Sequence, residues 1–96
     1  MEPANSDITV SNVVVSRAGR DQGEWFYVMD ADDTYLLLVN GKDRPLDKPK
    51  RKKRKHAQLV LRSETRVAAK LKSGDKVLNG ELRRDLAFLA REFASE

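Results

Sequence analysis

The densest group of chemically active side chains is a run of six consecutive cations, Lys50, Arg51, Lys52, Lys53, Arg54 and Lys55. Mutual repulsion disfavours an ordered isolated loop here, so we expect a counter-charge to order the run. A nucleic-acid backbone supplies such a charge and releases counterions when cations bind it. Arginine adds stacking and bidentate phosphate geometry that lysine lacks. We therefore predict that this run contacts RNA or DNA; the alternative is a solvated loop that only aids solubility.

The charge of the chain is strongly uneven. Residues 42–62 hold ten Lys or Arg and two Asp, a local net charge of +8, whereas all other residues together carry a net charge of −4. A mildly acidic body with one cationic segment indicates a localised contact with a polyanion, so Lys42 and Lys48 join the candidate RNA-binding residues. Residues 49–55 also resemble a nuclear localisation signal, an alternative that the sequence leaves open.

The chain has few residues or motifs for metal binding, catalysis or nucleotide binding. The chain has one histidine, His56, and no cysteine, so we predict no metal site, no disulfide and no catalytic relay. Asp30, Asp32 and Asp33 lack the glycine and the distal glutamate of a calcium loop. No phosphate-binding loop or dinucleotide fingerprint occurs either. We expect a protein that is not an enzyme, has no cofactor or small-molecule substrate and does not enter a membrane.

Four short segments have strand character. β-Branched and aromatic residues dominate residues 7–17, 24–29, 34–39 and 56–61. Polar turns separate them at residues 18–23, at 30–33 and at Asn40-Gly41. The arm at residues 48–55 has no apolar residue except Pro49 and is predicted to form no core strand. This pattern predicts a small, meandering antiparallel sheet or barrel.

The last third of the chain is predicted to be helical. Ser63 is a candidate N-cap and Gly74 a candidate stop for a first helix, and Asn79 is a candidate N-cap for a second. The second helix has an apolar stripe with helical spacing, formed by Leu78, Leu82, Leu86, Leu89 and Phe93. This stripe needs a cover, which is either the outer face of the barrel or an external partner.

Three adjacent aromatics occupy the second strand. Alternation sends Trp25 and Tyr27 to one face and Phe26, with Val28, to the other, where we expect the core. Trp25 and Tyr27 are expected to pack under the helix stripe; stacking on unpaired bases is the alternative, and Tyr35 has the same two options.

Residues 12–28 read NVVVSRAGRDQGEWFYV, an apolar strand, a glycine turn and an aromatic strand. Gly19 and Gly23 would allow positive φ and expose backbone N–H groups, while Arg17 and Arg20 could reach a phosphate. The segment resembles the KOW motif, and residues 7–61 are similar to the large-subunit ribosomal proteins of the archaeal and eukaryotic type and their small bacterial relatives. The chain departs from the general motif at its opening glycine, where Ser11 or Asn12 stands, and at a third glycine, where Phe26 stands.

The resemblance implies an SH3-like KOW barrel at residues 7–62 and a helical extension at residues 63–96. Residues 1–6 offer little to bury, so their composition predicts a flexible tail. The resemblance also implies a cytoplasmic protein bound to ribosomal RNA, the ribosome or ribosomal proteins. The contacts would come from the glycine loop (Arg17, Gly19, Arg20), the basic arm and His56. The alternative is a KOW protein-interaction module linked to transcription or translation factors.

Overall fold

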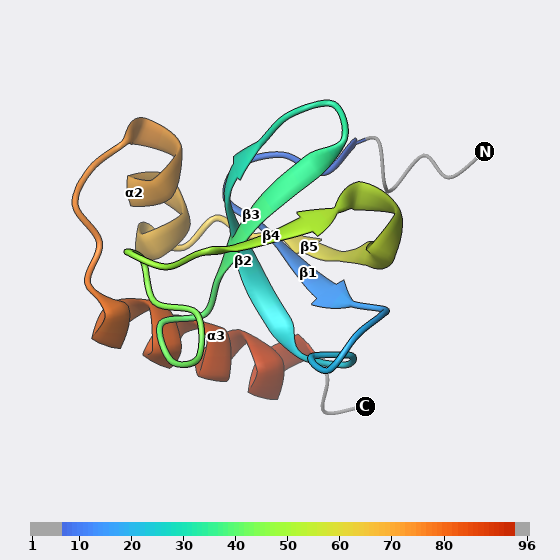
Figure 1. Cartoon of the computed structure of the whole chain (residues 1–96). Helices are drawn as coiled ribbons and strands as arrows, with labels where there is room; N and C mark the ends of the chain where they lie inside the picture. The colour runs from blue at the N-terminus through green and yellow to red at the C-terminus, as the bar shows by residue number, and fades with distance from the viewer. Residues whose placement is uncertain (1–6, 94–96) are drawn as a thin grey trace.

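The computed structural model describes residues 7–93, which form a five-stranded antiparallel sheet followed by two helices (Figure 1). The strands are β1 (Asn12–Ser16), β2 (Trp25–Ala31), β3 (Tyr35–Val39), β4 (Lys50–Lys53) and β5 (Ala57–Arg62), and η1 (Arg54–His56) is a 3-10 turn. The helices are α2 (Arg66–Ser73) and α3 (Asn79–Phe93). This architecture confirms the predicted class, mainly β with C-terminal α, and is compatible with a small SH3-like fold. The tail predicted at residues 1–6 lies outside the described residues.

The sheet is strongly curled. Its strand order is β4-β3-β2-β1-β5, so β4 and β5 lie at opposite ends of the hydrogen-bonded series. Only the three residues of η1 connect these two strands, so the two ends of the sheet must approach one another. β1 is shorter than predicted, because residues 7–11 form no strand and Ser11 turns the chain with a φ of 75°.

The two faces of the sheet carry separate apolar clusters. Phe26, Val28, Leu36 and Leu38 fill the inner cluster together with Ile8 and Val14. Val13, Tyr27 and Val39 point to the other face and pack against both helices, with Trp25 partly buried beside them. The predicted alternation of the aromatics is therefore confirmed, as is the packing of Trp25 and Tyr27 under the helices.

The apolar stripe of α3 rests on the outer face of the sheet. Leu82, Leu86 and Leu89 are buried in the cluster with Tyr27, while Leu78 and Phe93 at the two ends remain exposed. The sheet is thus the cover for the middle of this stripe. Neither α2 nor α3, the helices of the described region, is long and apolar enough to span a membrane.

The helix starts differ from the prediction. Thr65, not Ser63, caps α2 by accepting a hydrogen bond from the Ala68 amide, and Gly74 ends that helix as predicted. Asn79 is the first residue of α3 and its Oδ1 accepts from the Leu46 amide at 2.8 Å, so it ties down a loop instead of capping its helix.

Ser63 belongs to a buried polar cluster instead. The Tyr27 hydroxyl lies 2.8 Å from Ser63 Oγ and 3.2 Å from Thr65 Oγ1, and it donates to the Asp85 carboxylate. Thr65 Oγ1 also donates to Asp85 Oδ2 at 2.8 Å. Burial and the bond to Asp85 raise the pKa of Tyr27 to about 12. The cluster joins β2, the start of α2 and the middle of α3 at one point.

The connection from β3 to β4 spans residues 40–49 and is longer than the tight hairpin suggested by Asn40-Gly41. Asn40 Oδ1 accepts from the amides of Lys42 and Arg44, both at 2.9 Å, which fixes the turn. Gly41 has a φ of 77°, and a Cβ there would lie 2.4 Å from the Asn79 carbonyl oxygen. The loop therefore packs closely against the start of α3.

Candidate nucleic-acid interface

The basic run folds as a strand and a turn, not as an arm outside the sheet. Residues 50–53 form β4, which pairs antiparallel with β3, and residues 54–56 form η1. The sequence predicts no core strand at residues 48–55, and the strand found there, β4, lies at one end of the hydrogen-bonded series. An edge strand tolerates lysine because long side chains can lay their methylenes on apolar neighbours and carry the charge outward.

Alternation along β4 separates its cations into two sets. Lys50 and Lys52 pair with the buried Leu38 and Leu36, so they share the inner side of the sheet. Lys52 is only 7 % exposed, and its ammonium donates to the Ala18 carbonyl at 2.8 Å and to Asp21 Oδ1 at 3.1 Å. These two hydrogen bonds hold the Lys52 ammonium in the interior of the fold.

Asp21 supplies the counter-charge for this inner set. Lys50 Nζ lies 3.5 Å from Asp21 Oδ2, and the Ser16 hydroxyl lies 2.7 Å from Asp21 Oδ1. Burial alone would raise the pKa of Asp21, but the bonds from Ser16 and Lys52 and the charges of both lysines hold it below its ordinary value. The chain itself therefore neutralises and orders part of the run that we expected a polyanion to order.

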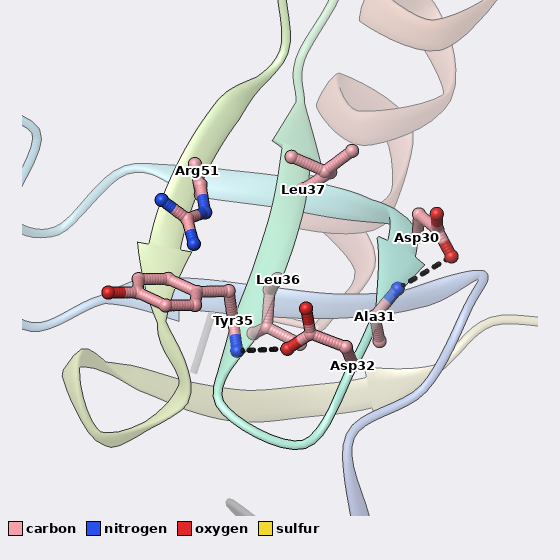
Figure 2. A pocket seen from close by; sticks show the side chains of 7 residues that line it. All are labelled: Asp30, Ala31, Asp32, Tyr35, Leu36, Leu37 and Arg51. Atoms are coloured by element: carbon pink, nitrogen blue, oxygen red, sulfur yellow. Dashed lines mark hydrogen bonds between the residues drawn. The ribbon is translucent and has the colours of Figure 1, made fainter.

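The outer set of cations is exposed. Arg51 and Lys53 point to the opposite side of β4, and Lys55 is exposed in η1. The Arg51 guanidinium lies over the Tyr35 ring, with its central carbon 3.6 Å from the ring centroid (Figure 2). Arg54 is half-buried and anchors η1, because it donates to the carbonyls of Asp32 at 2.7 Å and Ile8 at 2.9 Å.

The glycine loop lies against the same strand. Gly19 and Gly23 have φ values of 89° and 91°, as the sequence predicted. The loop is held to β4 through Ala18 and Asp21, the acceptors of Lys52, and Arg20 lines a shallow hollow together with Lys50. The structure thus brings the predicted loop and the predicted basic run together.

The remaining candidates surround this region. Arg17 is exposed beside β5, where its Nε donates to Gln58 Oε1 at 2.6 Å, and its amide donates to the His56 carbonyl at 2.8 Å. Lys42 and Lys48 are exposed in the 40–49 loop. We call the exposed side chains around β4 and η1 the cationic surface: Arg17, Arg20, Arg51, Lys53 and Lys55.

Two residues of this region were missed by sequence reasoning. Asp21 is the only acidic residue of the glycine loop, but nothing local indicates that it will meet Lys52, 31 positions away. Asp32 accepts from the Thr34 and Tyr35 amides at 2.9 and 2.7 Å and so shapes the turn beneath Arg51. The Asp21 contact depends on strand register, which the sequence pattern does not specify, whereas the Asp32 bonds are local and typical of an aspartate at the start of a turn.

In comparisons with known proteins, no family model matches the chain and no curated protein is similar enough to count as a relative.

Proposed function

We propose that this chain is a non-enzymatic, cytoplasmic RNA-binding protein that works on the ribosome, where it holds structured ribosomal RNA as a ribosomal protein or an associated factor. The observation that carries the proposal is the cationic surface, five exposed Lys and Arg side chains mounted around a hydrogen-bonded strand and turn. Structured RNA is bound mainly through its phosphates and its shape, for which a rigid array of cations is suited.

The rigidity of the surface favours a specific contact over a solvated charge. β4 is paired along its length with β3, Asp21 pairs with both of its inner cations, and Arg54 fastens η1 to two carbonyl oxygens. The outer cations are thereby presented in fixed positions with little conformational entropy left to lose from their backbone. Five phosphate contacts would give a salt slope of roughly −3.5, at −0.7 per contact.

The KOW resemblance gains support from the backbone. Gly19 and Gly23 both have positive φ, in the loop where the motif places its glycines. Ser11 also has a positive φ, 75°, in a buried turn just before β1. This is one of the two positions at which the general motif often has glycine, and its backbone conformation is one that glycine adopts readily.

Crosslinking in cells, followed by sequencing of the bound RNA, tests the proposal. We expect sites on large-subunit ribosomal RNA, and we expect the protein to move with ribosomal particles in a density gradient at moderate salt. A protein that stays at the top of the gradient and yields no ribosomal RNA crosslinks would contradict ribosome association.

A protein-interaction module is the alternative, and one observation favours it. Phe88 and Phe93 on α3 are 45 % and 59 % exposed, beside a hollow that Leu61 and Leu89 also line. Replacing the exposed cations of β4 and η1 with Gln separates the two functions. RNA affinity should collapse if RNA is the ligand, whereas binding through α3 would survive the change.

A further inference from the structure

A shallow hollow lies on the outer side of the sheet where the helices do not cover it. Along β3, Val39 is buried with α3, whereas Leu37 and Tyr35 on the same side are only partly buried. Beyond the helices, the hollow is lined by Asp30, Asp32, Tyr35, Leu37 and Arg51 (Figure 2). It adjoins the cationic surface through Arg51, which belongs to both.

One wall of the hollow is flat and cationic. The Arg51 guanidinium covers the Tyr35 ring at 3.6 Å, and the side chain is otherwise exposed. Stacking on tyrosine holds the guanidinium plane in a fixed orientation. A fixed guanidinium plane is a surface on which an unpaired base can stack.

The opposite wall carries hydrogen-bond acceptors in fixed positions (Figure 2). A bulge between Val28 and Asp30 shifts the register of β2, so that Asp30 lies opposite Leu37 on the outer side. Asp30 Oδ1 accepts from the Ala31 amide, and Asp32 Oδ1 accepts from two backbone amides. No hydrogen bond to Oδ2 of either carboxylate occurs within residues 7–93.

We propose that this hollow binds one unpaired guanine of the RNA, an inference that rests on the proposed function. The base would stack on Arg51 while its N1–H and N2 amino group donate to a carboxylate, preferentially that of Asp32. Uracil offers only one donor, and that donor lies between two carbonyl oxygens. A carboxylate repels these two oxygens, so uracil should bind less well. The positive charge of Arg51 disfavours a lysine or arginine of a partner protein, and the two carboxylates disfavour a phosphate.

Short U-rich oligonucleotides of about eight nucleotides test the inference, with guanine, inosine or uracil at the centre. We expect the guanine oligonucleotide to bind about tenfold more tightly than the all-uracil one. Inosine lacks the N2 amino group and should fall between them. Asp32→Asn should abolish the preference for guanine without lowering the affinity for all-uracil RNA, because an asparagine Oδ1 still accepts the two backbone amides.

Substitutions of Tyr35 and Arg51 test the stacking wall of the hollow. Tyr35→Phe should keep the preference and Tyr35→Ala should lose it; if Tyr35→Ala fails to fold, Arg51→Lys removes the plane and keeps the charge. Lys55→Gln is the matched control, expected to weaken all oligonucleotides without changing their ratio. Equal affinities for guanine and uracil in the unmodified protein, or binding to structured ribosomal RNA but to no oligonucleotide, would overturn this inference alone. Absence of binding to the oligonucleotides and to structured ribosomal RNA at low salt would overturn the proposed function as well.

Discussion

Two interior side chains with long-range hydrogen bonds, Lys52 and Tyr27, organise the residues around them. Lys52 brings its charge to Asp21 and the Ala18 carbonyl, and Tyr27 joins Ser63, Thr65 and Asp85. Buried polar groups cost free energy unless they are paired, so each site depends on partners that are distant in the sequence. The stability of each site is therefore sensitive to the removal of a single polar group.

Tyr27→Phe removes the hydroxyl but keeps the ring in the core. We expect the free energy of unfolding to fall by about 1–3 kcal/mol, because the Asp85 carboxylate and two hydroxyls lose their buried partner. Urea denaturation measures this change. A loss below the error of that measurement would contradict a stabilising role for this hydroxyl.

The same hydroxyl gives stability a dependence on alkaline pH. Its pKa is raised to about 12 in the folded chain from an ordinary value of 10.0, so its contribution is complete below pH 10 and is lost as pH rises towards 12. The stability of the unmodified protein is compared at each pH with that of Tyr27→Phe, which lacks only this hydroxyl. The difference in stability between the two proteins should shrink above pH 10; a constant difference would contradict the raised pKa.

At the scale of elements, β4 depends on the glycine loop. Asp21→Asn removes the counter-charge of Lys52, and we expect a loss of about 1–3 kcal/mol together with faster amide exchange in β4. Because the pKa of Asp21 is lowered on folding, its contribution is present above the ordinary carboxyl pKa and lost in acid. Asp43→Asn, at an exposed position, is the matched control. Equal exchange in β4 of both variants would contradict the dependence.

The packing of the 40–49 loop on α3 is also testable. Gly41→Ala places a Cβ against the Asn79 carbonyl at a positive φ, so we expect it to destabilise the fold by roughly 2–4 kcal/mol. Gly23→Ala is the control, because its φ is also positive but nothing lies within 4 Å of the added Cβ. Chemical denaturation should show the larger loss for Gly41→Ala; equal losses would mean that backbone strain alone matters.

Local patterns predicted the elements that bury apolar side chains. Alternation placed Phe26 and Tyr27 on opposite faces, and the spacing of Leu82, Leu86 and Leu89 gave the buried stripe of α3. Local patterns did not predict β4, because its inner residues are lysines, whose burial depends on an acidic partner supplied by another part of the fold.

The candidate site was predictable to a similar extent. Residue types and spacing identified the basic run and the glycine loop. They did not separate the buried Lys52 from the exposed Lys53, nor did they place Arg51 on Tyr35, because both results follow from the register of β4 on β3.

At the scale of the whole molecule, the segments at the two ends of β4 have different neighbours. The 40–49 loop packs on the start of α3, whereas η1 turns on the far side of the sheet from α2 (Figure 1). The helices complete the apolar core and the β4–η1 region presents the charge. A mildly acidic body with one strongly cationic segment is expected to orient itself on a polyanion before contact.

The salt dependence of RNA affinity tests this account most directly. Replacing Arg51, Lys53 and Lys55 with Gln should weaken binding at low salt and reduce the slope of log affinity against log salt by roughly two, at 0.7 per lost contact. A control that replaces Lys72, Lys76 and Arg91, three exposed cations in the helical part, makes the same change in net charge. The control should keep nearly the full slope. Equal slopes for the two variants, or an unchanged slope for the first, would contradict the claim that the cationic surface binds RNA.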